Sequence, residues 1–262
     1  MAPAIDTPNA VEAMYIALKS CPPGTPWLVA TGALTNIAVL FLLHPDLTLH
    51  IAGLSIMGGV IGGGFTDAKL GTTTYGSESF GNWTPYAEFN IFCDPEAAQS
   101  IFSNATLAAK TTLIPLDITH LALATSSVRS KLLYSTPNGT TSTPSRIRRM
   151  FHDLLIFFAR TYCDVFGLTE GPPLHDPLAI VVIFASELFT IGDEGGERFS
   201  VDVVREDLAQ TSRGNPKAVS QCGRTVARKA AKGEAGITIP RGLKVEAFWD
   251  IVGQCLVRAE KG

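Results

Sequence analysis

The 262-residue chain is poor in charge and lacks the features of a disulfide-rich or membrane-spanning protein. Asp, Glu, Lys and Arg make up 17% of the residues, against 46% hydrophobic ones. No apolar run reaches the ~18 residues of a membrane span, and no basic-plus-apolar signal pattern opens the sequence. The five cysteines are odd in number, widely spaced and without a C-x-x-C pair, which indicates free or buried thiols in a reducing compartment. We therefore expect a cytoplasmic protein that contacts no membrane.

Sequons at Asn82, Asn104 and Asn138 leave open the alternative of a secreted glycoprotein. Asn82 lies within a candidate binding segment described below, which weakens that alternative.

Several motifs of enzymes and nucleic-acid binders are also absent. The sequence has no G-x-S-x-G elbow, no H-E-x-x-H zinc motif and no G-x-x-x-x-G-K-[ST] phosphate loop. A net charge of -3 with mostly scattered basic residues lacks the basic stripe that nucleic acids require, so we expect no nucleic-acid partner. The basic run from Arg224 to Lys232 is interpreted as the solvated face of a helix.

The order of apolar segments predicts the fold class. Trp27 to Ala30 and Ile51 to Met57 read as buried strands, with a helix from about Leu34 to Leu43 between them. This β-loop-α-loop-β order predicts an α/β protein with a mostly parallel, Rossmann-like sheet flanked by helices. No clear boundary divides the chain, so we expect one domain over residues 1–262. Further predicted elements are a helix over Ala10 to Lys19, a helix from Pro95, a strand over Thr111 to Pro115, helices over Arg146 to Gly167 and Leu178 to Phe184, a strand over Phe199 to Val204, and a small sheet edge over Gly236 to Ile239 before a final helix over Val245 to Val257.

A carboxylate and a carboxamide, Glu88 and Asn90, lie two residues apart shortly before a helix start at Asp94-Pro95-Glu96. In an extended segment this spacing places both side chains on one face. Glu88 can accept hydrogen bonds from two hydroxyls, and Asn90 can both donate and accept. The pair is therefore typical of a site that binds a sugar.

Three other segments complete a recognisable order: Ala30-Thr31-Gly32-Ala33-Leu34-Thr35-Asn36-Ile37-Ala38, Ile56-Met57-Gly58-Gly59 and His175-Asp176-Pro177-Leu178-Ala179. Together with the Glu88 segment they resemble the inosine-uridine preferring nucleoside hydrolases over about residues 10 to 190. The glycine-rich stretch from Gly58 to Asn82 and Trp83-Thr84-Pro85-Tyr86 are more similar to the fungal uridine-type members. The resemblance implies hydrolysis of the N-glycosidic bond of ribonucleosides to base and ribose, with a bound calcium ion.

The resemblance also implies roles for individual residues. His175 faces the leaving base as a catalytic group, and Asp176 and the backbone carbonyl of Thr31 are calcium ligands, Asp176 being counted as catalytic too. The remaining matched positions surround the substrate: Met57, Asn82, Glu88, Phe89 and Asn90 at the ribose, and Tyr162 against the base. His120 is interpreted as structural or as supporting the site from behind. The aromatic face of the predicted helix over residues 146–167 is otherwise read as core.

One departure from the family pattern is large. A segment of the form Asp-x-Asp-Pro-Gly-x-Asp-Asp, which supplies two calcium ligands and the general base in the family, has no match here. We therefore expect the N-terminal strands of the sheet to be missing, an incomplete calcium site, and an N-terminally truncated product, a gene-model fragment or an inactive relative. The alternative function is a catalytically inactive relative that at most binds ribose or a nucleoside. Members of the family commonly form homo-oligomers, so a dimer or tetramer is expected of the full-length form.

Overall fold

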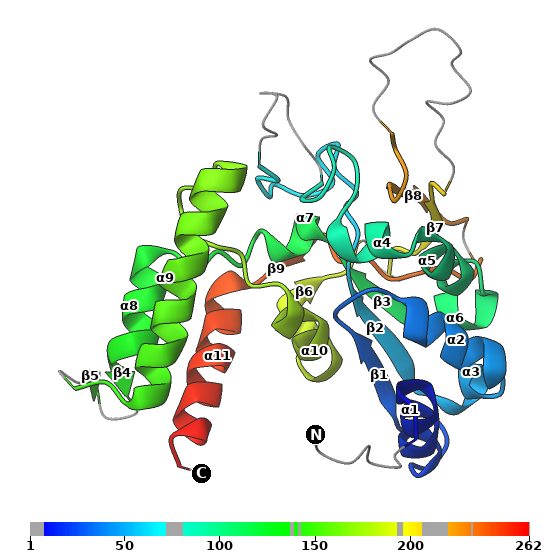
Figure 1. Ribbon diagram of the computed structural model, residues 1–262, viewed down its shortest axis with the longest axis horizontal. Helices are drawn as coiled ribbons and strands as arrows, with labels where there is room; N and C mark the ends of the chain where they lie inside the picture. Colours follow the sequence, from blue (N-terminus) through cyan, green and yellow to red (C-terminus); the bar gives the residue numbers. More distant parts are fainter. Residues whose placement is uncertain are drawn as a thin grey trace, which may run out of the picture.

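The structure, a computed structural model, describes residues 8–71, 81–136, 139–140, 143–192, 196–205, 220–231 and 233–261. Its centre is a parallel sheet of three strands in the order β1-β2-β3 (Figure 1). The strands are β1 (Trp27–Ala30), β2 (Gly53–Met57) and β3 (Thr111–Ile114). Every residue of β2 is buried, as expected for the central strand of a parallel sheet covered on both faces. The predicted α/β class and parallel sheet are confirmed.

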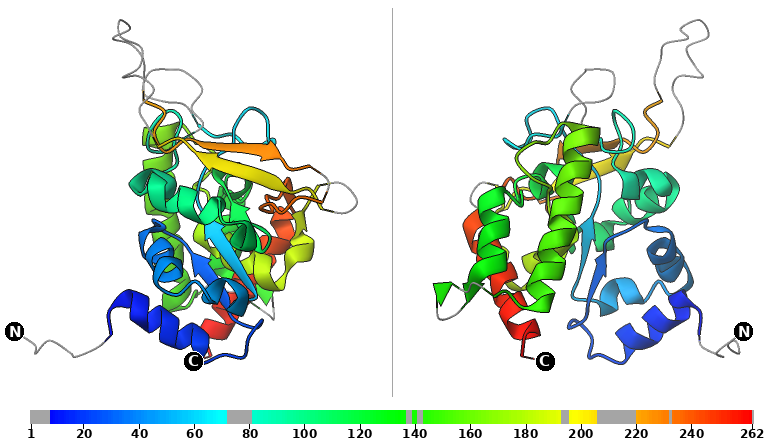
Figure 2. Two further views of the ribbon diagram at one scale, coloured as in Figure 1. Left: turned by 90° about the vertical axis from the view of Figure 1, so that its right-hand side faces the viewer. Right: turned by 60° about the vertical axis from the view of Figure 1, so that its left-hand side comes forward.

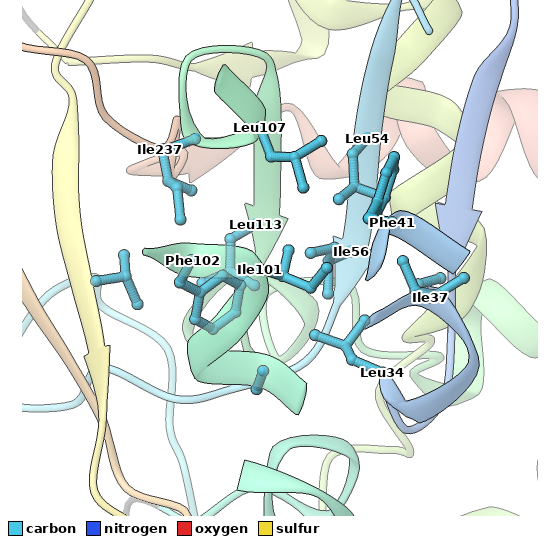
Figure 3. Close-up of a cluster of buried hydrophobic side chains, with 14 of the residues drawn as sticks. Leu34, Ile37, Phe41, Leu54, Ile56, Ile101, Phe102, Leu107, Leu113 and Ile237 are labelled. Atoms are coloured by element: carbon cyan, nitrogen blue, oxygen red, sulfur yellow. The ribbon is translucent and has the colours of Figure 1, made fainter. Parts of the chain in front are cut away.

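Helices from the first half of the chain cover one face of this sheet. They are α1 (Ala10–Lys19), α2 (Thr35–Leu43), α3 (Leu47–His50), α5 (Pro95–Phe102) and α6 (Ala105–Ala108). Asn9 and Asp94 cap α1 and α5 by accepting from backbone N–H groups of the first turn. Figure 3 shows how side chains from α2, α5, α6 and the strands meet, with Phe41 beside Leu54 and Ile101 beside Ile56.

A second hydrophobic cluster lies on the other face of the sheet. It is formed by α10 (Asp176–Phe184), which contacts β2, and by a layer of three long helices. These are α8 (Ser126–Tyr134), α9 (Arg146–Phe166) and α11 (Val245–Ala259), which run side by side in Figures 1 and 2. The buried hydroxyl of Ser55 in β2 donates to the carbonyl of Ala179 at 2.6 Å and so fixes α10 against the sheet.

Short antiparallel pairs complete the described architecture. They are β4 (Ser135–Thr136) with β5 (Gly139–Thr140), β6 (Phe189–Thr190) with β9 (Gly242–Leu243), and β7 (Phe199–Val203) with β8 (Thr225–Lys229); the remaining elements are α4 (Phe89–Cys93), α7 (Leu116–Thr119) and the 3-10 turn η1 (Ser186–Leu188). The expected edge over Gly236 to Ile239 is present only as isolated bridges, from Ile237 to Phe199 and from Thr238 to Thr112.

The interpretation of Arg224 to Lys232 as a helix face was wrong, because most of this run is strand β8. It pairs with β7 in the register Ser200 opposite Arg228 and Asp202 opposite Val226. Figure 2 shows the two strands side by side. Arg228 also forms an ion pair with Asp202 at 2.7 Å. The physical reason is tertiary: β7 buries Phe199, Val201 and Val203 in the core and leaves an edge whose backbone groups need a partner.

The bounds of several helices and strands can be compared with those predicted from the sequence. α1 and β1 have the predicted bounds, and α2 begins one residue later than expected. The predicted strand over residues 51–57 begins only at Gly53, because the short helix α3 fills the preceding turn. α4 and α8 had no prediction, since neither has a long apolar period.

We expect Ile56→Ala to lower the free energy of unfolding by about 2–5 kcal/mol, because it leaves a cavity in a fully buried strand. Leu42→Ala, at a side chain that is 79% exposed, is the matched control and should change it by no more than about 0.5 kcal/mol. Urea unfolding followed by circular dichroism measures both. Equal losses in the two variants would contradict the described packing.

Candidate functional site

The residues of the candidate site gather beyond the carboxyl ends of the three parallel strands. Thr31 directly follows β1, Gly58 directly follows β2, and α7 follows β3 after Pro115. In open α/β sheets this edge is where ligands bind, because parallel strands all end there. His175 and Asp176 join it from the start of α10, which packs on β2.

The short segment that follows β3 is buried throughout and holds the loop after β2. The carboxylate of Asp117, 2% exposed, accepts from the backbone N–H of Ile61 at 2.8 Å and from that of Gly62 at 2.9 Å. Its backbone carbonyl accepts from the hydroxyl of Thr66 at 2.6 Å. Burial raises the pKa of Asp117, and the two N–H donors oppose this shift. The sequence analysis missed this residue, although an aspartate just after a buried strand was the available signal.

His175 lies in a chain of side-chain hydrogen bonds. Its Nε2 is 2.8 Å from the hydroxyl of Tyr162, and its Nδ1 is 2.7 Å from the hydroxyl of Thr119. Tyr162 comes from the last turn of α9 and Thr119 from α7, so three distant segments meet at this imidazole. Two of the residues expected at the leaving base are therefore in direct contact.

Burial sets the protonation of these groups. It lowers the pKa of His175 to about 3, helped by the neighbouring His120, whose ring centroid is 5.6 Å away. The pKa of Tyr162 is raised to about 12 by burial first and then by the charges of Asp176 and Glu88. At neutral pH the pair is thus a neutral imidazole and a neutral phenol.

His120 is more deeply buried than His175, at 4% exposure. Its Nδ1 is 2.9 Å from the carbonyl of Lys69. A carbonyl only accepts, so Nδ1 carries the hydrogen. Nε2 is then an acceptor, and it has no partner among the residues that the structure describes. The ring of His120 lies beside that of His175, with centroids 5.6 Å apart.

The local geometry around Glu88 differs from the extended segment that the spacing predicted. Glu88 is the N-cap of α4, and Asn90 lies inside the helix. The Glu88 carboxylate, 2% exposed, accepts from the N–H groups of Gly59 at 2.8 Å, Asn90 at 2.9 Å and Ile91 at 3.1 Å. Burial raises its pKa, against the effect of these three donors. Glu88 therefore joins α4 to the backbone that follows β2.

Asn90 continues this connection. Its Nδ2 donates to the carbonyl of Met57 at 3.1 Å and lies 3.3 Å from the Met57 sulfur. Since the amide nitrogen must face the carbonyl, Oδ1 remains an acceptor, and no bond to it is formed within the described part of the chain. Met57 itself is buried at 3% exposure.

Asn82 and Phe89 form the outer wall of this region. Asn82 Oδ1 accepts from the N–H of Phe89 at 3.0 Å. The Phe89 side chain is 45% exposed and packs edge to face against Trp83, with ring centroids 5.1 Å apart. An exposed aromatic pair is suited to a flat or partly apolar ligand.

The two residues expected to bind calcium, Asp176 and Thr31, both lie at this edge of the sheet. Asp176 has a solvent-exposed carboxylate at the first turn of α10, and Thr31 is also exposed. Calcium collects six to eight oxygen ligands. Within the described ranges no three His, Cys, Asp or Glu side chains cluster to hold a metal, and Glu88 already serves three backbone donors. The described residues therefore do not complete a calcium site.

Solved structures resemble this fold closely. A purine-preferring ribonucleoside hydrolase from Gardnerella vaginalis superposes with a TM-score of 0.68 at 22% identity, over 95% of this chain and 65% of that one. A plant nucleoside hydrolase gives a TM-score of 0.69 at 19% identity, over 97% and 69% of the two chains. The chain thus has the fold of the nucleoside hydrolases.

Sequence comparison gives the family. The family model described as inosine-uridine preferring nucleoside hydrolase matches residues 2–250. The uridine nucleosidase of Saccharomyces cerevisiae is 30% identical over 240 residues, 89% of this chain and 61% of the yeast protein. The pyrimidine-specific ribonucleoside hydrolase of Shewanella woodyi is 38% identical over 183 residues, 70% of this chain and 49% of that protein. This chain belongs to the inosine-uridine preferring nucleoside hydrolase family, and it spans about half to three fifths of the length of these curated relatives.

We expect Asp117→Asn to release the loop after β2, because a carboxamide cannot accept at both of its terminal atoms. Amide hydrogen exchange should become faster at Ile61 and Gly62. Asp67→Asn, at an exposed position of the same loop, is the control and should leave both rates unchanged. Unchanged exchange in Asp117→Asn would show that the carboxylate does not hold the loop.

His120 should make the protein less stable in acid. Burial lowers its folded pKa to about 4, whereas an unfolded imidazole has a pKa of ~6.5. Between these values the unfolded state binds more protons, so the free energy of unfolding falls as the pH falls, by up to about 1.4 kcal/mol per pH unit. His120→Asn, whose amide can still donate to Lys69, should flatten this dependence in urea unfolding from pH 7 to 4. An equal slope in both proteins would contradict the assignment.

Proposed function

We propose that this chain acts in the hydrolysis of the N-glycosidic bond of ribonucleosides of the uridine and inosine type, giving free base and ribose. The observation that carries the proposal is the Tyr162–His175 pair, at 2.8 Å, beyond the carboxyl end of the parallel sheet. Family membership and relatives named as a uridine nucleosidase and a pyrimidine-specific ribonucleoside hydrolase support it.

Cleavage of an N-glycosidic bond makes three demands on a site. N-glycoside cleavage passes through an oxocarbenium-like state, so the site must orient the ribose, help the base to leave and activate water. The neutral Tyr162–His175 pair supplies an O–H or N–H donor to the departing base. Asn90 Oδ1 is the acceptor for a ribose hydroxyl, while Met57, Asn82 and Phe89 shape the pocket and Glu88 holds its backbone.

No described residue is assigned here to the activation of water. We propose Asp176 and the Thr31 carbonyl as the two calcium ligands on this chain, with Asp176 exposed as a ligand must be. Together these groups offer at most three oxygens, against the six to eight that calcium collects, so no step of the reaction is derived through the ion. The alternative, a relative that binds a nucleoside without turnover, is favoured by this shortage of carboxylates.

Three further proposals concern the protein as a whole. We propose that residues 1–262 form one domain, which is supported by two hydrophobic clusters on opposite faces of one sheet. We propose a homo-oligomer in the full-length form, a dimer or tetramer. We also propose a cytoplasmic protein, because the five cysteines are odd in number, widely spaced and without a C-x-x-C pair. Within the described segments no helix has the length and apolarity to cross a membrane.

The test is release of ribose from uridine and inosine by the purified chain, measured with added calcium and with a chelator. Calcium-dependent release that Asp176→Ala lowers by at least about 100-fold, through the loss of one charged ligand, would support the proposal. Asp67→Ala, at an exposed loop carboxylate, is the control for charge and should retain the wild-type rate. No release from folded protein, with nucleoside binding retained in calorimetry, would favour the alternative instead.

A further inference from the structure

The hydrogen bonds of His175 restrict where its hydrogen can sit. At pH 8, above the ordinary pKa of an imidazole, the ring is neutral and carries one hydrogen. It has two hydroxyl neighbours: Thr119 at Nδ1, 2.7 Å away, and Tyr162 at Nε2, 2.8 Å away. A hydroxyl can donate or accept. Distances alone therefore allow the hydrogen bonds to run from Thr119 through His175 to Tyr162 or in the opposite direction.

The burial of Thr119 decides between them. Thr119 is 0% exposed, and its hydroxyl has no hydrogen-bond partner other than His175 among the described residues. If His175 donated from Nδ1, the Thr119 O–H would be buried without an acceptor, which is unfavourable because its hydrogen bond to water would be lost without replacement. If Thr119 donates to Nδ1, the hydroxyl is satisfied, and the imidazole hydrogen moves to Nε2.

We propose that Thr119 is a positioning residue that sets the tautomer of His175 by donating its hydroxyl hydrogen to Nδ1. The hydrogen on Nε2 then donates to the oxygen of Tyr162. Because that oxygen already accepts from His175, the Tyr162 O–H is free to point at the leaving base. The inference rests on the proposed function for this last consequence only; the tautomer itself is a property of the free protein.

His120 gives an internal comparison. The carbonyl of Lys69 requires a hydrogen on its Nδ1, so the two neighbouring histidines carry their hydrogens on opposite nitrogens. Both constraints come from one buried stretch, in which Asp117 holds the loop after β2, Thr119 holds His175, and His120 holds the Lys69 backbone. The Thr119 contact is thus one of several by which this buried stretch fixes neighbouring groups.

The first test reads the tautomers directly and needs no turnover. Protein labelled with nitrogen-15 in histidine is studied at pH 8 by long-range proton–nitrogen correlation. We expect the hydrogen on Nε2 for His175 and on Nδ1 for His120. Thr119→Val removes the donor at nearly equal volume and should give a mixture of tautomers at His175, whereas Thr119→Ser should restore the Nε2–H form.

Tyr162→Phe separates the two neighbours of the ring. It removes the other hydroxyl, yet His175 should keep its hydrogen on Nε2, because Thr119 still donates to Nδ1. A wild-type His175 with its hydrogen on Nδ1 would overturn the inference, as would an unchanged tautomer in folded Thr119→Val protein. Backbone amide spectra of each variant establish that it is folded.

Kinetics test the consequence for the base. Thr119→Val should lower kcat for uridine by about 10- to 100-fold with little change in KM, and Thr119→Ser should recover most of it. With 4-nitrophenyl riboside, whose leaving group needs no donor, the loss should be absent. An equal loss on both substrates would show that Thr119 has only a structural role. If the wild type releases no ribose at all, the proposed function fails, while the tautomer measurement still decides the role of Thr119.

Discussion

The site depends on two buried carboxylates that hold the backbone leaving the central strand. Glu88 accepts from the N–H of Gly59, and Asp117 accepts from those of Ile61 and Gly62. Gly59 and Gly62 have positive φ angles, so this segment cannot continue as a strand, and its donors need other partners. A Cβ at Gly59 would also lie 2.9 Å from the Thr225 hydroxyl, which requires glycine there.

Carboxylates serve this purpose because each one accepts several hydrogen bonds at once. Their burial has an electrostatic cost, visible in the raised pKa values of both Glu88 and Asp117, which the backbone donors offset in part. The same two residues belong to different segments of the site. Glu88 begins the helix that carries Asn90, and Asp117 lies in the helix that carries Thr119. The loop after β2, α4 and α7 are therefore connected through these two acidic side chains.

The residues expected at this edge of the sheet differ in charge. His175 and Tyr162 are both uncharged near pH 7, and Asp176 is the exposed carboxylate among the expected residues. Such a site is suited to binding an uncharged nucleoside and donating a hydrogen bond to its base. Within the described residues it lacks a cluster of acids to hold a metal and activate water.

The sequence by itself determined the α/β class, the bounds of α1 and β1, and the four segments that meet at the carboxyl edge of the sheet, because these follow from apolar period, helix caps and local motif order. It could not show that Glu88 caps α4, that Asp117 holds the loop, or that Arg224 to Lys232 forms most of a strand beside β7. Only the tertiary structure decided these points. Each depends on which distant backbone group lacks a hydrogen-bond partner, and that is known only after the sheet has brought the segments together.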